Sequence, residues 1–348
     1  MTRIAASRER EADRRSDRAA PGTYDGPGRG LRVLILTNMY PTPDEPQFGC
    51  FVKDQADDLR RLGVDVRVLA FDGRTDKRRY LGAARELRRA CRNEHFDIVH
   101  AHYGLSGVVA ATQTGAPVVT TFHGSDTWVS WQRAASWVAA RRSQPIAVAQ
   151  VVAARLGVSH APVIPCAVDL DRFTPIGREE ARRGLGWPVA GRCVLFPASR
   201  TDRSKIRNKR VDLFDAAVSR LRRRTPDVFT ASLDGLDRGQ VALAMNAADV
   251  AVMTSEREGA PIVVKELLAC ETPVVSVPVG DVGETVRGLP GCAIAPRGPA
   301  ALAEAAGVAL RSGRDPILRE RMVAYGRRPI AERVLAVYRL VLAGGITR

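Results

Sequence analysis

The chain has 348 residues, of which 45% are hydrophobic and 26% are charged, so its composition is that of a globular protein long enough for two domains. No apolar run reaches the roughly 20 residues of a membrane-spanning helix, and the Arg-rich N-terminus has no apolar signal core, which predicts a cytoplasmic protein. The net charge of +15 favours polyanionic partners, namely nucleic acid, an anionic membrane surface or phosphorylated small molecules. Because no signature of a nucleic-acid-binding domain is present, no nucleic acid is expected among them.

The six cysteines are scattered, without a C-x-x-C pair or a Cys/His cluster at ligand spacing. Neither a disulfide framework nor a zinc site is therefore expected. Two motifs that bind nucleotides are also missing: no G-x-G-x-x-G follows the first predicted strand, and no G-x-x-x-x-G-K-[ST] occurs. The sequence thus argues against an NAD enzyme and a P-loop NTPase.

Residues 1–30 have few apolar residues and mixed charges, which predicts a disordered, basic N-terminal tail. From Leu31 on, apolar runs of strand length alternate with helical patterns. In the first half the predicted strands are LRVLILTNMY, VDVRVLAF, FDIVHAH and APVVTTFHG, and the helices are FVKDQADDLRRLG, LGAARELRRACRN and a small-residue helix near residues 107–114. This alternation predicts a doubly wound parallel sheet.

The proline-rich segment APVIPCAVDLDRFTP interrupts the alternation and reads as a linker. The alternation then restarts, with predicted strands RCVLFPAS, VFTASLDG, DVAVMTS, TPVVSVPVG and GCAIAP, and with helices over residues 209–224, 240–247, 299–310 and 331–342. Two Rossmann-like units are therefore expected on either side of residues 160–188.

The stretch SEREGAPIVVKELLAC carries two glutamates, Glu258 and Glu266, separated by seven residues. Pro261 suits the first position of a helix, so Glu258 is expected in the preceding loop and Glu266 in the second helical turn. The helix follows a predicted strand and so begins at the carboxyl edge of the sheet, where its free N–H groups and dipole favour a phosphate. Such a site suits a nucleoside diphosphate, with Glu266 on the ribose hydroxyls. Alternatively, Glu258 is simply solvated and Glu266 is a satisfied core residue.

Several segments, in order, resemble the retaining glycosyltransferases of family 4, which have the GT-B fold. The E-x7-E stretch with the following ETPVV carries this resemblance together with GCFVKDQADDLRRLGVDVRVL, FDIVHAH, TTFHGSD, VIPCAVDLDRFTP and MNAADVAVMTS. It covers roughly residues 31–342. The implied fold is α/β, with two Rossmann-like doubly wound parallel-sheet domains facing a central cleft.

The resemblance implies a sugar-nucleotide donor held mainly by the second domain. Glu266 then holds the ribose and Glu258 the donor sugar. The remaining donor-binding candidates are Gly49 in the first loop and Gly259, Ala260, Pro261 and Ile262 around the helix start.

In the first domain, His123 of TTFHGSD matches the family's active-site histidine beside the anomeric centre. His100 and His102 are expected to share one face of their strand because side chains alternate along it, and they are interpreted as structural or cleft-lining. Asp126 is a candidate either for orienting His123 or for contacting the acceptor, and His102 is a further candidate at the acceptor side. With no third ligand at suitable spacing, no metal site is predicted.

The leaving diphosphate needs positive charge, which the family supplies with an Arg and a Lys rather than a metal. In PASRTDRSKIRNKRVDLF the choices by position are Arg200 and Lys209, with Arg203 and Lys205 as competitors. The chain departs from the family pattern at Glu271, where glycine is usual, and at Cys166 and Ala167, which replace Asn-Gly. In these departures the chain resembles the branch of the family that includes enzymes of teichuronic acid and exopolysaccharide assembly.

The predicted domains are residues 31–172, on the acceptor side, and 173–326, on the donor side, with 327–348 as a C-terminal helix returning to the first domain. The predicted function is a retaining, metal-independent transfer of a hexosyl group from a UDP- or GDP-sugar to a sugar or lipid-linked acceptor, in cell-envelope, exopolysaccharide or other glycoconjugate biosynthesis. No cofactor is expected. The alternatives are a sugar-nucleotide epimerase of GT-B fold, a phosphorylase, and a non-catalytic protein that binds polyanions.

The helix KRRYLGAARELRRACR carries enough basic residues to contact the anionic inner face of a membrane, which would suit a lipid-linked acceptor. The other interpretation is the solvated helix of a basic protein.

Overall fold

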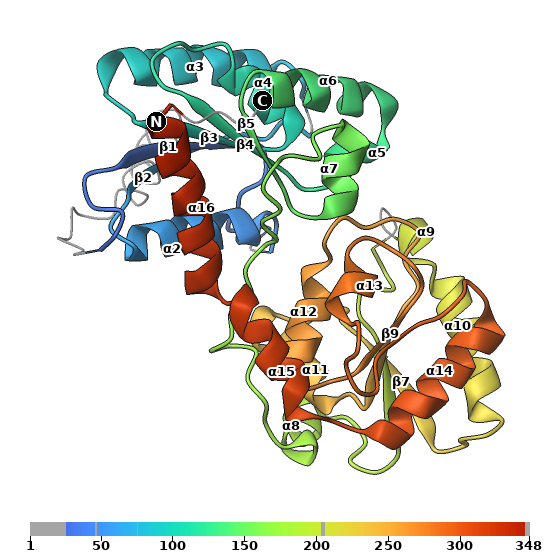
Figure 1. The fold of residues 1–348 in the computed structure, drawn as a ribbon. Helices are drawn as coiled ribbons and strands as arrows, with labels where there is room; N and C mark the ends of the chain where they lie inside the picture. Colours follow the sequence, from blue (N-terminus) through green and yellow to red (C-terminus); the bar gives the residue numbers. More distant parts are fainter. Residues whose placement is uncertain (1–25, 46, 75, 203–205, 345–348) are drawn as a thin grey trace, which may run out of the picture. The chain divides into compact units, whose positions relative to one another are not determined.

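The computed structural model describes residues 26–45, 47–74, 76–202 and 206–344 (Figure 1). The chain forms two compact units. Unit 1 contains the residues up to Val148, Val152–Ile164 and those from Ala331 on, and unit 2 contains Ala149–Val151 and Pro165–Ile330. The sequence predicts the first boundary after residue 172, which is C-terminal of the observed one after Ile164. It predicts the second after residue 326, which is N-terminal of the observed one after Ile330. The last residues of the predicted tail form turns, in which the Gly28 N–H donates to the Leu62 carbonyl at 2.7 Å, while residues 1–25 lie outside the described part.

Unit 1 is built on a five-stranded parallel sheet with strand order β2-β1-β3-β4-β5. Its strands are β1 (Arg32–Thr37), β2 (Asp65–Ala70), β3 (Ile98–His102), β4 (Val118–Phe122) and β5 (Gln144–Ala147). Its helices are α2 (Cys50–Arg61), α3 (Arg79–Asn93), α4 (Gly104–Ala110), α5 (Ser125–Trp128), α6 (Ser130–Arg141), most of α7 (Gln150–Leu156) and most of α16 (Arg327–Leu342).

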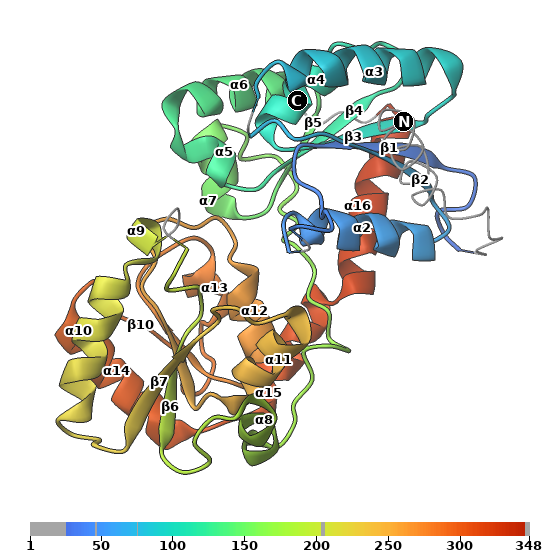
Figure 2. The same ribbon diagram turned by 180° about the vertical axis from the view of Figure 1, so that it is seen from behind.

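The two faces of this sheet differ in chemistry. Val99 and Ala101 of β3 lie on one face, in an apolar core with α3 and α4. Side chains alternate along a strand, so His100 and His102 lie on the opposite face. Figures 1 and 2 show α3, α4 and α6 over the first face and α2 with α16 over the second. The expectation that the two histidines share a face is confirmed by their stacked rings, whose centroids are 4.6 Å apart.

Unit 2 repeats this topology, with strand order β10-β9-β8-β6-β7. Its strands are β6 (Arg192–Phe196), β7 (Val228–Ser232), β8 (Val250–Met253), β9 (Val274–Ser276) and β10 (Ala293–Ile294). Its helices are α8 (Arg178–Leu185), α9 (Ile206–Lys209), α10 (Val211–Arg222), α11 (Arg238–Ala247), α12 (Ile262–Ala269), α13 (Val282–Thr285), α14 (Pro299–Ser312), α15 (Pro316–Met322) and the 3-10 helix η1 (Val323–Tyr325).

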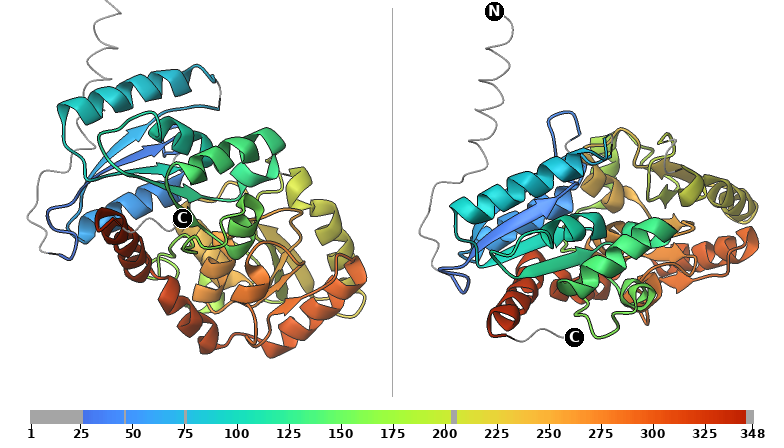
Figure 3. Two further views of the ribbon diagram at one scale, coloured as in Figure 1. Left: turned by 45° about the horizontal axis from the view of Figure 1, so that its top comes forward. Right: turned by 90° about the horizontal axis from the view of Figure 1, so that it is seen from above.

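Apolar clusters on the two faces of this second sheet involve α11, α12 and α15 on one face and α10 and α14 on the other, where α10 and α14 lie side by side (Figure 3). In both units the chain order reverses beside the first strand, between β1 and β3 and between β6 and β8. Open α/β sheets bind ligands at the carboxyl ends of the strands at such a switch point. The topology therefore predicts ligand-binding sites in the loops that follow β1, β3, β6 and β8.

The structure differs from the sequence-based elements in several places. Helix α8 follows the segment expected to be a linker and lies within residues 160–188, where no helix was predicted, and α15 was not predicted either. Helix α12 begins at Ile262, and Pro261 is its N-cap, with extended backbone at φ −65° and ψ 111°, rather than its first helical residue. Within the described part of the chain, no helix is long and apolar enough to cross a bilayer.

Candidate active site

In unit 2 the loops after β6 and β8 bring Lys209 and Glu258 together. The Lys209 Nζ lies 2.6 Å from the Glu258 Oε1, and both side chains are mostly buried. Lys209 ends the short helix α9, and Glu258 lies three residues before the N-cap of α12. Two of the predicted site residues, chosen from segments about 50 positions apart, therefore form one ion pair at the switch point.

Backbone contacts hold these two loops against each other. The Asn208 side chain donates to the Arg257 carbonyl at 3.0 Å, and the Asn208 carbonyl accepts from the Glu256 N–H at 2.7 Å. The Thr254 hydroxyl donates to the Lys209 carbonyl at 2.8 Å. From the other side, the guanidinium of Arg297 donates to the carbonyl of Glu256 at 3.1 Å. These hydrogen bonds thus fix the positions of the two loops that carry Lys209 and Glu258.

Helix α12 presents its N-terminus beside this pair. The amides of Ile262 and Val263 have no acceptor within the described residues. A helix of this kind favours an anion at its start. Among the other donor candidates, Gly259 and Pro261 are buried and Ala260 and Ile262 are half-buried.

Glu266 lies one turn further along α12 and is 8% exposed. Its Oε1 is 3.9 Å from Nη2 of Arg238, the first residue of α11, which is a long ion pair. The carboxylate in the apolar helix therefore has a cationic neighbour from the next helix and lies close to the protein surface.

Three further residues in or near this helix were not found from the sequence. Lys265 is 1% exposed, and its Nζ pairs with the Asp281 Oδ2 at 2.6 Å. Burial raises the pKa of Asp281, although Lys265 acts to lower it. Gly280 adopts φ +55°, and a Cβ at this position would lie 2.4 Å from the Gly259 carbonyl oxygen. These contacts fix the loop that carries Glu258, and only the tertiary structure reveals them.

Arg200, the other predicted phosphate ligand, is engaged elsewhere. Its Nη2 lies 2.8 Å from both carboxylate oxygens of Asp215, and its backbone N–H donates to Asp234. Burial acts to raise the pKa of Asp234, but hydrogen bonds from Ser199 and other donors of this loop hold it well below its usual range. Arg203 and Lys205 lie outside the described residues.

In unit 1, the candidate site contains three neighbouring histidines, of which His100 and His102 are buried and His123 is half-buried. Nδ1 of His102 lies 3.0 Å from Nε2 of His123, and the two rings are stacked. His100 is fully buried, with Nδ1 2.6 Å from the Tyr338 hydroxyl and Nε2 2.8 Å from the Thr121 hydroxyl. His100 thus has a structural role, whereas His102 contacts the predicted active-site histidine directly.

Burial keeps these rings neutral. It lowers the pKa of His102 to about 3 and lowers the pKa values of His100 and His123 well below 6.5, with neighbouring histidines adding to both of the latter shifts. A hydrogen bond between two neutral imidazoles needs one donor and one acceptor. Nε2 of His102 is buried without a partner among the residues that the structure describes, and a buried N–H left unpaired costs more than a lone pair left unpaired. His102 therefore donates from Nδ1, and His123 accepts at Nε2 and carries its own proton on Nδ1.

Asp126 holds the backbone near His123. Its two carboxylate oxygens accept the N–H groups of Gly124 at 2.9 Å and Gly104 at 3.1 Å, and the side chain is buried. Burial raises its pKa to about 6, while these backbone hydrogen bonds act in the opposite direction. A cavity of about 210 Å³ adjoins Asp126, and Tyr103 and Lys77 also line it.

The loop after β1 and the start of α2 lie close to His123. Gly49 adopts φ +69° at the start of α2, and a Cβ there would lie 2.4 Å from the backbone carbon of Met39. The ring of the nearby Phe51 lies 4.8 Å from that of His123. Gly49 thus allows close packing of the loop at the first switch point.

No group of three or more His, Cys, Asp or Glu residues suited to a metal ion occurs among the residues described here.

Comparisons with known proteins agree with this fold. The family model described as Glycosyltransferase Family 4 matches residues 27–172, and that described as Glycosyl transferases group 1 matches residues 232–328. The chain is 25% identical to the putative teichuronic acid biosynthesis glycosyltransferase TuaC of Bacillus subtilis, over 79% of this chain and 88% of that protein.

Two solved structures show the same fold. Sucrose-phosphate synthase from Thermosynechococcus elongatus is 18% identical, with a TM-score of 0.69 over 90% of this chain and all of that one. HepE from Anabaena, solved in complex with UDP and glucose, is 16% identical, with a TM-score of 0.65 over 88% of this chain and 99% of that one. With both of its units matched by these models and neighbours, the chain belongs to the group 1 glycosyltransferases of family 4 and has the GT-B fold.

Proposed function

We propose that this enzyme transfers a sugar, with retention of the anomeric configuration, from a nucleoside diphosphate sugar to an acceptor hydroxyl. The observation that carries the proposal is the Lys209–Glu258 ion pair beside the N-terminus of α12, with Glu266 on the same helix. The carboxylate of Glu258, the cation of Lys209 with the first amides of α12, and the carboxylate of Glu266 thus suit the sugar, the diphosphate and the ribose of such a donor, in that order.

In this proposal the diphosphate accepts hydrogen bonds from Lys209 and from the first amides of α12. Glu266 accepts the two ribose hydroxyls, and Glu258 accepts a hydroxyl of the donor sugar. Lys209 then has two partners, because its three N–H groups can serve both Glu258 and a phosphate oxygen. The donor lies with its sugar toward Glu258 and its nucleoside toward Glu266.

During transfer the acceptor oxygen bonds to the anomeric carbon while the bond from that carbon to the diphosphate oxygen breaks. The acceptor proton passes to an oxygen of the leaving phosphate on the same face. Lys209 and the α12 dipole stabilise the negative charge that develops there, so no metal ion is required. His123 donates from Nδ1 and does not act as a base through Nε2, which His102 occupies.

The HepE structure supports a nucleotide-sugar donor, since that protein was solved with UDP and glucose and shares this fold. We place the acceptor in unit 1, at the cavity lined by Asp126. The relation to TuaC favours an acceptor of cell-envelope or exopolysaccharide assembly.

Titration calorimetry tests the donor site. UDP, GDP, ADP and their glucose conjugates are titrated into the wild-type protein and into Glu266→Gln and Glu258→Gln. We expect Glu266→Gln to weaken binding of the free nucleotide, and Glu258→Gln to weaken the sugar conjugate but not the nucleotide. Glu256→Gln is the matched control, because Glu256 lies in the same loop with an exposed side chain. Absence of binding by every nucleotide to the wild-type protein would refute the proposal.

Helix α3 supports a contact with an anionic membrane for a lipid-linked acceptor. Ala83, Ala84, Leu87 and Ala90 are buried, so the basic residues occupy the exposed face, from which Leu81 projects with 65% exposure. Sedimentation with vesicles tests this point. We expect binding to vesicles with anionic lipid and none to neutral vesicles, and equal partitioning would contradict it.

A further inference from the structure

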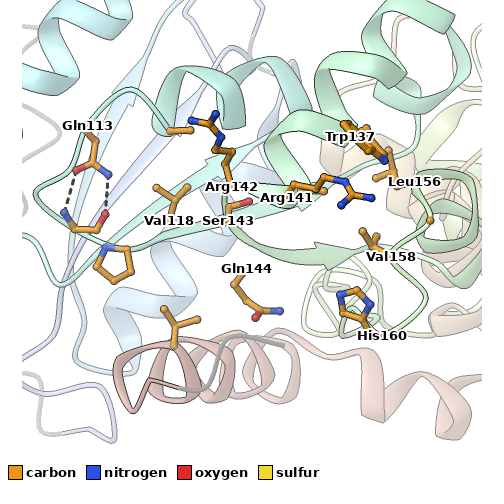
Figure 4. Close-up of a pocket in the computed structure, with 16 residues that line it drawn as sticks. Gln113, Val118, Trp137, Arg141, Arg142, Ser143, Gln144, Leu156, Val158 and His160 are labelled. Atoms are coloured by element: carbon orange, nitrogen blue, oxygen red, sulfur yellow. Dashed lines mark hydrogen bonds between the residues drawn. The ribbon is translucent and has the colours of Figure 1, made fainter. Parts of the chain in front are cut away.

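A second cavity in unit 1 lies at the amino ends of the sheet strands, whereas the candidate active site lies at their carboxyl ends (Figure 4). Its volume is about 560 Å³, within the range of small-molecule sites. Val118 and Gln144, which line it, are the first residues of β4 and β5. His102 and His123 lie at the carboxyl ends of their strands, so this cavity is separate from the site described above.

One part of the cavity wall is apolar. It is formed by Val118, Leu156, Val158 and, from helix α16, Val341. At about 30 Å³ for each group, the cavity has room for roughly 20 non-hydrogen atoms.

The other part of the wall is cationic. Arg141, Arg142 and His160 line it, and no Asp or Glu is among the residues that form the cavity. The Arg141 guanidinium lies 4.1 Å from the ring centroid of Trp137, which holds it in place by a cation–π contact. Within the described part of the chain, Arg142 forms no side-chain hydrogen bond or ion pair.

The remaining polar groups of the wall are already used within the protein. Gln113 donates to the Ala116 carbonyl and accepts two backbone N–H groups, and the Ser143 hydroxyl contacts Thr120 and the Ala139 carbonyl. The two guanidiniums are therefore the main groups left to bind a ligand.

The nearby helix ends reduce this positive charge but do not cancel it. Helices α4, α6 and α7 end at this side, and a helix C-terminus carries at most about half a negative charge. Helices α4 and α7 have only seven residues each, so their share is smaller. The two full positive charges of Arg141 and Arg142 exceed the partial negative charge of these helix ends.

We propose that this cavity binds an amphiphilic anion. Its phosphate or carboxylate head group pairs with the guanidinium of Arg141 or of Arg142, whose side chains point in different directions (Figure 4), and its apolar body lies against Val118, Leu156 and Val341. Bidentate pairing with arginine suits both head groups. The proposal does not depend on the donor site, because it concerns binding alone.

Calorimetry with three soluble probes tests the two halves of the proposal. Dihexanoyl phosphatidic acid has both a charged head and apolar chains, glycerol 3-phosphate has only the head, and dihexanoyl phosphatidylcholine has the chains without net charge. We expect the first to bind with 1:1 stoichiometry and the other two at least about tenfold more weakly. Equal affinity for glycerol 3-phosphate would overturn the apolar half, and equal affinity for the choline lipid would overturn the charged half. No binding of the first probe would overturn both.

Variants locate the binding to this cavity. The double substitution Arg141→Gln and Arg142→Gln, and the cavity-filling Ala111→Phe, are each expected to weaken phosphatidic acid by at least about tenfold. Arg133→Gln is the matched control, because Arg133 is exposed on the same helix and does not line the cavity. Thermal unfolding and UDP titration verify that each variant is folded. Unchanged affinity in the first two, or an equal loss in the control, would overturn the assignment.

Discussion

The buried histidines of unit 1 predict that this unit loses stability as the pH falls from 8 to 5. The pKa of His102 falls from an ordinary value of 6.5 to about 3 on folding, and the pKa values of His100 and His123 are also well below 6.5. A folded pKa below the unfolded one means that only the unfolded chain takes up the proton. The stability is therefore present above pH 6.5 and is lost as the pH falls below it.

The magnitude follows from one proton for each ring. A histidine that stays neutral in the folded unit destabilises it by about 2 kcal/mol between pH 8 and pH 5. Asp126 acts in the opposite direction. Its pKa rises from 3.8 to about 6 on folding, so the folded unit takes up this proton more readily than the unfolded chain and gains about 1 kcal/mol of stability between pH 8 and pH 5. Burial raises the pKa of the adjacent Tyr338, so it does not titrate in this range. His102 and Asp126 together therefore give a net loss of about 1 kcal/mol, to which His100 and His123 add in the same direction.

Urea unfolding followed by tryptophan fluorescence measures this loss, because Trp128, Trp131 and Trp137 all lie in unit 1. The variant His102→Phe keeps an aromatic ring in the stack but cannot be protonated. We expect it to lose about 2 kcal/mol less than the wild-type protein between pH 8 and pH 5. His160→Gln is the control, because this ring is exposed and lies outside the histidine cluster. An unaltered pH dependence in His102→Phe would refute the reasoning.

Two further predictions concern unit 2. Lys209→Gln is expected to cost about 1–3 kcal/mol of stability, since the mostly buried Glu258 loses its cationic partner, and to lower kcat about a hundredfold because Lys209 stabilises the leaving phosphate; thermal unfolding and steady-state kinetics measure the two effects. Gly280→Ala is expected to cost more than about 2 kcal/mol, because its Cβ meets the Gly259 carbonyl in addition to the strain of positive φ, whereas Gly313→Ala, with φ +71° and open space, carries the backbone strain alone. Equal losses of unfolding free energy in the two glycine variants would contradict the steric argument.

Much of the fold could be predicted because the apolar runs are long and their order is regular. Strands β1, β3, β4, β6 and β8 are nearly continuous apolar segments, as expected of parallel strands covered on both faces. The elements that were missed are short or polar. Helix α8, for example, is rich in Arg and Glu, and it follows directly after the proline-rich segment that was predicted to be a linker.

The candidate site was predictable where it follows a strand and not where it depends on a distant partner. His123 comes directly after a buried strand and Glu258 lies in the loop that follows one, so the sequence places them at a sheet edge. The choice of Lys209 among four neighbouring basic residues depends on contacts with a loop 49 residues away. Tyr338, which binds His100 across 238 residues, carries no local signal at all.

The histidine cluster also shows why such residues are hard to interpret from sequence. His100 and His102 alternate correctly for one face of a strand, and a leucine or phenylalanine there would fill the same buried space without the loss of stability at low pH. A buried polar set is costly unless every member is hydrogen-bonded, and Nε2 of His102 is not. His100, which has two partners, is explained by structure alone. His102 is not, and within the described residues its side chain is hydrogen-bonded to His123; a residue that weakens the fold while fixing the tautomer of its neighbour is best explained by the chemistry of that neighbour.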